Sequence, residues 1–164
     1  MDTNKLTKQI NTMLHPRAAL IAYSTDGGDT YFLEVRSIDN EGAMSEGRPV
    51  FAAGVAVAPP TCWRYYDTVY TERFMRTPKE NAAGYARGPI SQADKLHGKL
   101  LICHGTADDN VHFRNSMEYA EALVQAGKPF MMLPYNNRNH NITGGNTRNH
   151  LYTSITNFFI ENMK

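Results

Sequence analysis

Short apolar runs alternate with amphipathic stretches over the C-terminal three quarters of the chain. Three runs have the length and continuity of buried strands, and they cover residues 51–58, 99–104 and 130–135. Apolar residues recur at helical spacing between and after these runs, so helices are predicted within 63–97, over 115–126 and over 150–163. This alternation predicts an α/β fold with a mostly parallel sheet flanked by helices.

Two of the predicted helices have a definite apolar side. The side expected to face the core of the first is made of Met117, Ala120, Leu123 and Val124, and Gly127 ends that helix. The side expected to face the core of the closing helix is made of Leu151, Ile155, Phe158 and Phe159.

The first 42 residues have a different pattern of apolar and polar residues. A helical pattern over residues 6–14 stops at His15-Pro16, and strand-like runs at 18–23 and 30–38 flank a Gly-rich turn, which is a β-hairpin signature. The texture changes again near residues 44–50. The chain therefore divides into an N-terminal helix and hairpin of unknown role (1–42) and a larger α/β part (43–164).

Composition narrows the function classes. The net charge of +1 gives no electrostatic attraction for nucleic acid. No stretch approaches the ~18 apolar residues of a membrane span, and the N-terminus lacks the apolar region of a secretory signal, so the chain as written is expected in the cytoplasm. Cys62 and Cys103 have no metal or redox spacing, which favours buried free thiols over a disulfide.

The most informative polar pattern follows the second apolar run. A turn from His104 to His112 carries Asp108, and about thirty residues later His140 lies in a second polar loop, which is the order of acid and base in the Ser…Asp…His triad of α/β-hydrolases. By itself Asp108 would more often be a turn or helix cap, and His140 a solvated histidine. A zinc site from His104, His112 and His140 is disfavoured because no helical i,i+4 pair or CxxC supports it.

Longer strings carry a resemblance to a known family. They are Gly54 to Pro59, the long aromatic string Trp63 to Met75, His104 to His112, and His140. On these strings residues 43–164 resemble the C-terminal part of the catalytic domain of dipeptidyl peptidase IV-like serine peptidases, within the prolyl oligopeptidase family. The resemblance implies a partial α/β-hydrolase that releases X-Pro or X-Ala dipeptides from peptide N-termini. Intact bacterial relatives would be periplasmic or exported.

The resemblance also implies roles for particular residues. Asp108 matches the triad acid and His140 the triad base. Tyr66 and Tyr70, helped by Trp63 and Val111, match the lining of the pocket for the proline side chain. Asn110 matches an asparagine that steadies the carbonyl of the substrate's N-terminal residue. The resemblance implies no cofactor and no metal, a peptide with a penultimate Pro or Ala as partner, and a homodimer through the C-terminal helix.

The nucleophile is where the chain departs from the family. The family carries a Gly-Trp-Ser-Tyr-Gly-Gly elbow roughly ten residues before the position of Met44, which here falls at Glu34 in a strand-like run. No Gly-x-Ser-x-Gly occurs in the 164 residues. Ser24 lies in Tyr-Ser-Thr-Asp, without the flanking glycines of an elbow, and we therefore interpret it as an ordinary hairpin-turn residue and not as the nucleophile. The sequence thus indicates a truncated or fused peptidase piece that is inactive alone. Two alternatives stay open, namely a non-catalytic peptide-binding or dimerisation module and a serine supplied by another chain.

Overall fold

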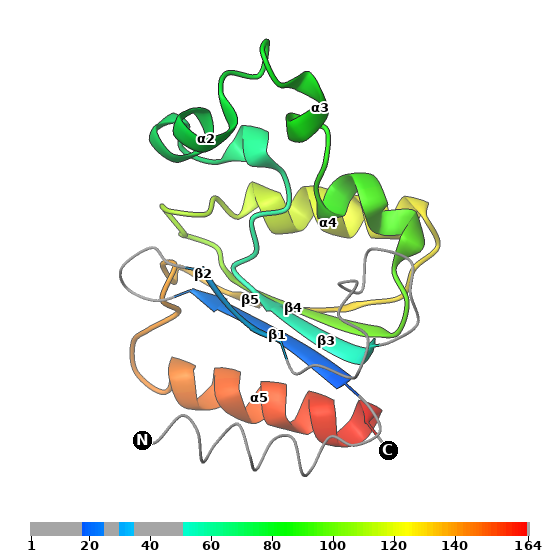
Figure 1. Cartoon of the computed structure of the whole chain (residues 1–164). Coiled ribbons are helices and arrows are strands. Elements are labelled where there is room, and N and C mark those ends of the chain that lie inside the picture. Colours follow the sequence, from blue (N-terminus) through cyan, green and yellow to red (C-terminus); the bar gives the residue numbers. More distant parts are fainter. Residues whose placement is uncertain (1–17, 25–29, 35–50, 164) are drawn as a thin grey trace.

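The computed structural model describes the backbone of residues 18–24, 30–34 and 51 and the whole of residues 52–163. The described part is a five-stranded sheet between helical layers (Figure 1). The strands are β1 (Ala18–Ser24), β2 (Thr30–Glu34), β3 (Phe51–Val57), β4 (Lys99–Gly105) and β5 (Met131–Tyr135). The helices are η1 (Trp63–Tyr65), α2 (Thr68–Met75), α3 (Ala82–Tyr85), η2 (Pro89–Lys95), α4 (Arg114–Gln125) and α5 (Thr147–Asn162).

The sheet has the order β2-β1-β3-β4-β5. β1 and β2 form an antiparallel hairpin, and β1, β3, β4 and β5 run parallel to one another. The predicted α/β class, the mostly parallel sheet and the N-terminal hairpin are therefore confirmed. The helical pattern of residues 6–14, the end of the second hairpin strand at 35–38 and the texture change near 44–50 lie outside the described residues.

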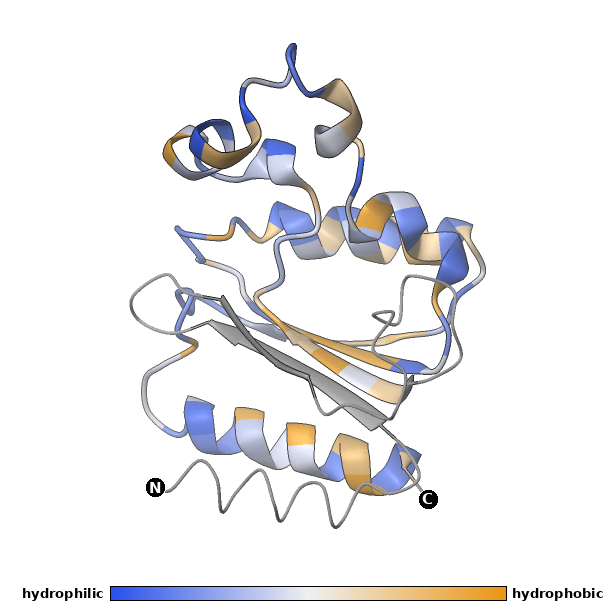
Figure 2. Ribbon diagram, viewed as in Figure 1, coloured by the Kyte–Doolittle hydropathy of each residue, from blue (hydrophilic) through white to orange (hydrophobic). Residues whose placement is uncertain are grey.

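The two faces of the sheet carry separate apolar clusters. Alternate residues of β3 and β4 point to opposite faces, as the period of a strand requires. One face packs Val55, Leu101 and Cys103 against Leu151 and Phe158 of α5. The other face packs Leu100 and Ile102 against η2 and against Tyr119 and Leu123 of α4. In Figure 2 apolar colour marks the middle strands, which lie between the two helical layers.

The inward side of α5 is as predicted, whereas the prediction for α4 is right for Leu123 and wrong for Met117 and Val124. Met117 and Val124 are 51% and 58% exposed, whereas Asn115, Ser116, Tyr119 and Leu123 are buried. The two polar residues are buried because each finds a partner, Asn115 on the segment after β3 and Ser116 on His104. Hydrogen-bonded polar groups can occupy a core position at little cost, and this rotates the helix away from the purely apolar pattern.

A long excursion between β3 and β4 carries η1, α2, α3 and η2, and α2 and α3 lie beyond α4 as seen from the sheet (Figure 1). Thr61 fastens its start to α4. The Thr61 backbone N–H donates to Asn115 Oδ1 (3.0 Å), and its hydroxyl donates to the Asn115 carbonyl (2.7 Å). Both residues are buried, so this contact fixes where the aromatic residues that follow must lie. Within the described ranges no helix is long and apolar enough to cross a membrane.

Candidate active site

Asp108 lies in the turn that follows β4, at the carboxyl end of the sheet. Its Oδ1 accepts hydrogen bonds from the backbone N–H groups of Asn110 and Val111, both at 2.9 Å. A short carboxylate that accepts from the backbone two and three residues ahead stabilises a tight turn. Asp108 thus acts as a turn cap through one oxygen, and its other oxygen remains for a different partner.

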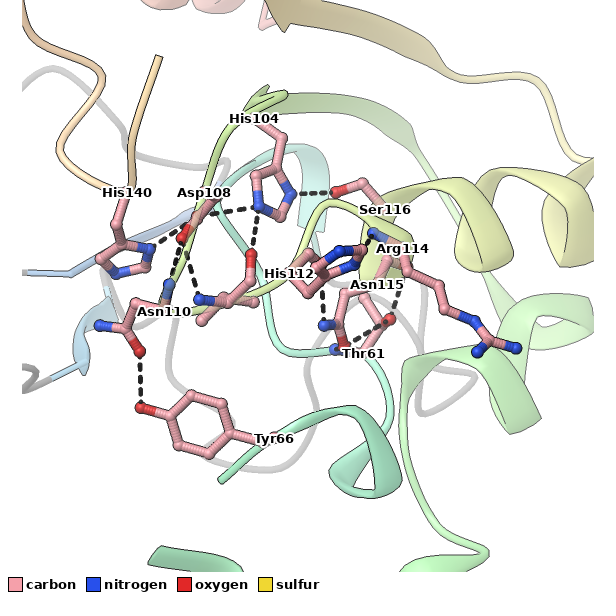
Figure 3. A network of polar contacts seen from close by, with 11 residues as sticks. Thr61, Tyr66, His104, Asp108, Asn110, His112, Arg114, Asn115, Ser116 and His140 are labelled. Carbon is pink, nitrogen blue, oxygen red and sulfur yellow. Dashed lines mark hydrogen bonds and ion pairs between the residues drawn. The ribbon is translucent and has the colours of Figure 1, made fainter. Parts of the chain in front are cut away.

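That partner is His140, which the fold brings from the loop after β5. Its Nδ1 lies 2.8 Å from Asp108 Oδ2, and its side chain is 9% exposed (Figure 3). A carboxylate only accepts, so the proton of a neutral His140 lies on Nδ1 and Nε2 has a free lone pair. None of the described residues hydrogen-bonds to that Nε2. The imidazole is thus oriented as a proton acceptor.

The loops that carry Asp108 and His140 are joined by their backbones. Ala107 N–H donates to the Arg138 carbonyl (3.0 Å), and Asn137 N–H donates to the Thr106 hydroxyl (2.8 Å). Gly105 allows this approach, because a Cβ there would lie 2.6 Å from the Asn139 carbonyl oxygen. Real Cβ atoms do not come so close to backbone oxygen, so glycine at this strand end is a requirement of the site.

The electrostatics of the pair favour an ionised acid. Burial alone would raise the pKa of Asp108, because it penalises the charged form. Hydrogen bonds from His104 and His140, the charge of His140 and the Asn110 N–H outweigh burial and hold the pKa of Asp108 well below its usual range. The carboxylate therefore stays charged wherever the protein is folded near neutral pH.

The aromatic residues approach the same turn from the excursion after β3. The rings of Trp63 and Tyr70 stack at 6.4 Å, and Tyr66 meets Tyr70 edge-on at 5.4 Å. Tyr66 donates its hydroxyl hydrogen to Asn110 Oδ1 at 3.0 Å. Burial, followed by the negative charge of Asp67, raises the pKa of Tyr66, so this hydroxyl keeps its proton. Asn110 thus connects the aromatic cluster to the turn of Asp108.

The sequence of this α/β part matches a known family. Residues 42–164 match the prolyl oligopeptidase family. The chain belongs to this family. Its relatives include prolyl endopeptidase FAP of Mus musculus (42% identical over 120 residues, 71% of this chain and 16% of that protein). Dipeptidyl peptidase 4 of Felis catus is 42% identical over 119 residues, 70% of this chain and 16% of that protein.

A solved structure of the family has the same fold. The crystal structure of Porphyromonas gingivalis dipeptidyl peptidase 4 matches with a TM-score of 0.71 and 56% identity, over 73% of this chain and 17% of that one. The relatives are serine peptidases of the α/β-hydrolase class, so this chain is a partial α/β-hydrolase by fold as well as by sequence. The chain spans about 16% of the length of these two curated relatives.

Six of the seven residues that the resemblance selected are linked by contacts, in the order His140, Asp108, Asn110, Tyr66, Tyr70 and Trp63. Val111, the seventh, meets this group through its backbone. It is buried, and the backbone is its clearest contribution, since its N–H binds Asp108 and its carbonyl accepts from His104 Nε2 at 2.8 Å. Ser24 is the last residue of β1 and is described by its backbone alone. Cys103 is buried as expected, whereas Cys62 is half-buried.

Three residues that shape the site around Asp108 and His140 belong to no motif in the sequence that would have predicted a role for them. They are Gly105, Thr61 and Asn115, whose roles depend on contacts between segments far apart in the chain. His104 is at zero exposure and contacts Asp108 through its Nε2. Over the described residues no group of three or more His, Cys, Asp or Glu side chains is arranged to hold a metal ion.

Proposed function

We propose that residues 43–164 are the C-terminal part of a serine dipeptidyl peptidase that releases X-Pro or X-Ala dipeptides from peptide N-termini. One observation carries this proposal, the 2.8 Å hydrogen bond between His140 Nδ1 and Asp108 Oδ2 across 32 residues of sequence. It leaves the opposite ring nitrogen free to accept a proton, which is the arrangement that a serine hydrolase needs. Family membership independently favours the same reaction.

In this proposal His140 moves the protons of the reaction and Asp108 supports it. His140 Nε2 takes the hydroxyl proton of the attacking serine as its oxygen bonds to the substrate carbonyl carbon. The imidazolium then gives that proton to the leaving amine as the peptide bond breaks, and an acyl-enzyme remains. A water molecule then attacks the ester carbon while the same Nε2 takes its proton, and the imidazolium returns that proton to the serine oxygen as the ester bond breaks and the dipeptide leaves. Asp108 holds the ring in one tautomer and stabilises its charged form.

The aromatic cluster supplies the substrate side. A proline ring is apolar and compact, and the faces of Tyr66, Tyr70 and Trp63 offer it an aromatic surface. Asn110 Oδ1 already accepts from Tyr66, so its amide N–H groups are the ones available to bind a substrate carbonyl. These contacts support recognition of a peptide with proline or alanine in second place.

The chain is proposed to be inactive alone, because no Gly-x-Ser-x-Gly elbow occurs in its 164 residues. Loss of the nucleophile of a serine peptidase costs on the order of 10⁶-fold in rate. The proposal also includes the division of the chain into an N-terminal segment of unknown role (1–42) and the peptidase part (43–164). If a serine from another chain completes the site, the pair Asp108 and His140 would serve it unchanged.

A second candidate function is a non-catalytic peptide-binding or dimerisation module. It is favoured by the coexistence of an intact aromatic cluster with a sequence that has no elbow. For dimerisation, the candidate surface is the outer side of α5, where Tyr152 and Ile160 are each 59% exposed. Sedimentation velocity of the wild type and of Ile160→Asp tests this: a dimer that dissociates in the variant supports it, and a monomer at all concentrations rejects it.

Activity and binding are separated by one pair of assays. The first follows a Gly-Pro chromogenic amide with the wild type, Ser24→Ala and His140→Ala. The second follows the emission of Trp63, the single tryptophan of the chain, during titration with Gly-Pro and with Gly-Gly as the control peptide. The expected result is no turnover and a saturable response to Gly-Pro only.

Each other outcome has a definite meaning. Turnover that survives in Ser24→Ala but disappears in His140→Ala indicates a serine from another chain. Turnover abolished by both substitutions contradicts the rejection of Ser24 as nucleophile. Neither turnover nor a response to Gly-Pro, in a protein shown to be folded, contradicts the peptidase proposal and the binding alternative together.

A further inference from the structure

His104 is the last-but-one residue of β4 and is completely buried, although it is a titratable side chain. Each ring nitrogen has a specific partner. Nδ1 lies 2.6 Å from Ser116 Oγ, and Nε2 lies 3.0 Å from Asp108 Oδ2 and 2.8 Å from the Val111 carbonyl. Phe113 packs its ring edge-on against the imidazole at 5.4 Å. Both ring nitrogens of this buried histidine are thus satisfied by specific partners, so its position serves more than apolar packing.

The contacts determine where the proton of His104 lies. Both partners of Nε2 are acceptors, a carboxylate oxygen and a carbonyl oxygen, so Nε2 must donate. Nδ1 can then accept from the Ser116 hydroxyl. The reverse assignment, with the hydroxyl accepting, would leave the Ser116 hydrogen without an acceptor, because among the described residues its Oγ has only the His104 contact. A buried donor without an acceptor is costly.

With that tautomer, Asp108 receives four donors. Oδ1 accepts from two backbone N–H groups, and Oδ2 accepts from His104 Nε2 and His140 Nδ1. Four donors match the four lone-pair positions of a carboxylate. The two donors on Oδ2 come from different segments, one fixed in β4 and one in the loop after β5. The carboxylate therefore cannot turn away from His140 without also disturbing its bond to His104.

We propose that His104, whose ring is anchored at Nδ1 by Ser116 and donates from Nε2, is a positioning residue that orients the Asp108 carboxylate toward His140. This inference rests on the proposed function, in which Asp108 and His140 work as a pair. His104 does not touch substrate in this account. It acts through Asp108. Because His104 lies in β4 and its partner Ser116 lies in the first turn of α4, the position of the acid is fixed relative to both the sheet and that helix.

The test reads the imidazole protons directly by ¹H–¹⁵N NMR of the whole chain at pH 8. The wild type is compared with His104→Leu, which removes the donor, and with His104→Gln, whose amide can donate from nearly the position of Nε2. His97→Gln is the matched control, because His97 is exposed. Ser116→Ala removes only the hydroxyl and keeps the test open if His104→Leu does not fold.

The expected wild-type result is a proton on Nε2 of His104 and a slowly exchanging proton on Nδ1 of His140. In His104→Leu the His140 proton should exchange with water at least tenfold faster, and it should return toward the wild-type rate in His104→Gln. Ser116→Ala should leave the proton on Nε2 of His104, because both acceptors of that nitrogen remain, and it should speed the exchange of the His140 proton less than His104→Leu does, because the ring loses only its anchor at Nδ1. The ¹³Cγ signal of Asp108 should titrate at higher pH in His104→Leu, while His140 and Tyr66, the other titratable groups that face it, remain in place.

Two failures can be told apart. If wild-type His140 carries its proton on Nε2, the pairing with Asp108 fails and the proposed function fails with it. If wild-type His140 is protonated on Nδ1 but His104→Leu leaves its exchange rate and the Asp108 titration unchanged, only the positioning role is overturned. A proton on Nδ1 of His104 in the wild type also overturns it.

Discussion

Replacing Asn115 by alanine removes the side-chain part of the contact that places the aromatic cluster over the turn of Asp108. Asn115 Oδ1 accepts from the backbone N–H groups of Thr61 (3.0 Å) and Cys62 (3.3 Å), and its Nδ2 donates to the His112 carbonyl (3.0 Å). In Asn115→Ala the buried Thr61 N–H loses its acceptor. The His112 carbonyl keeps its bond from the Asn115 backbone N–H, and half-buried Cys62 can gain water.

The expected loss in the free energy of unfolding follows from the hydrogen bonds that are lost. One fully buried donor without a partner costs about 1–3 kcal/mol, and a partly exposed one costs less. We therefore expect the free energy of unfolding to fall by about 3 kcal/mol. With urea m-values of about 1–3 kcal/mol per M, the midpoint of unfolding should fall by about 1–3 M. Emission of Trp63 should shift to the red already in the native baseline, because its segment loses both N–H contacts to the Asn115 side chain and keeps the bond from the Thr61 hydroxyl to the backbone carbonyl.

The control is Asn157→Ala, an exposed asparagine of α5. Surface substitutions usually change stability by less than about 0.5 kcal/mol, and alanine is the better helix former here. If Asn115→Ala costs no more than this control, the buried contact does not hold the two segments together. A large cost with unchanged native Trp63 emission would show that Asn115 stabilises the fold without placing the aromatic cluster.

Further predictions concern the turn and the core. Gly105→Ala should separate the two loops, because its Cβ would press on the Arg138 and Asn139 carbonyl oxygens; the slow exchange of the His140 proton should be lost in a protein that remains folded, as judged by circular dichroism. The pKa of Asp108 is lowered in the folded state, so its ionised form stabilises the fold above the unfolded value of about 3.9 and this contribution is lost as the pH falls. Urea midpoints of Asp108→Asn should therefore decline less than those of the wild type between about pH 5 and pH 2. Leu123→Ala, at a site of zero exposure between η2 and β4, should cost about 2–5 kcal/mol in urea unfolding, and a cost below about 1 kcal/mol would contradict the packing described.

Periodicity predicted the strands and helices of residues 51–163 well, because apolar side chains bury on one face whatever their partners are. It failed for the inward side of α4, where Met117 and Val124 were expected and Asn115 and Ser116 are found. A hydropathy pattern cannot foresee that a polar side chain will meet Thr61, which lies 54 residues earlier in the chain. Burial of polar groups depends on such partners, and a single sequence does not show them.

The pair of Asp108 and His140 was predictable because the motif and its order in the chain are specific. The close approach of the two loops at the site was less predictable. Gly105 reads as an ordinary strand-end glycine, and only the approach of the loop after β5 shows why no larger residue fits. The four donors around Asp108 likewise come from three separate segments, β4, the turn itself and the His140 loop. Their convergence is a property of the sheet, where parallel strands end at one edge.

The central claim is that Asp108 holds His140 with its proton on Nδ1, which leaves Nε2 ready for a nucleophile. It is tested most directly by the ¹⁵N spectrum of His140 in the wild type and in Asp108→Asn. We predict protonation at Nδ1 in the wild type. In Asp108→Asn we predict a switch to Nε2, because the amide oxygen stays on the Asn110 and Val111 N–H groups and the NH₂ group then faces Nδ1. The same protonation site in both proteins, or Nε2 in the wild type, would contradict the claim.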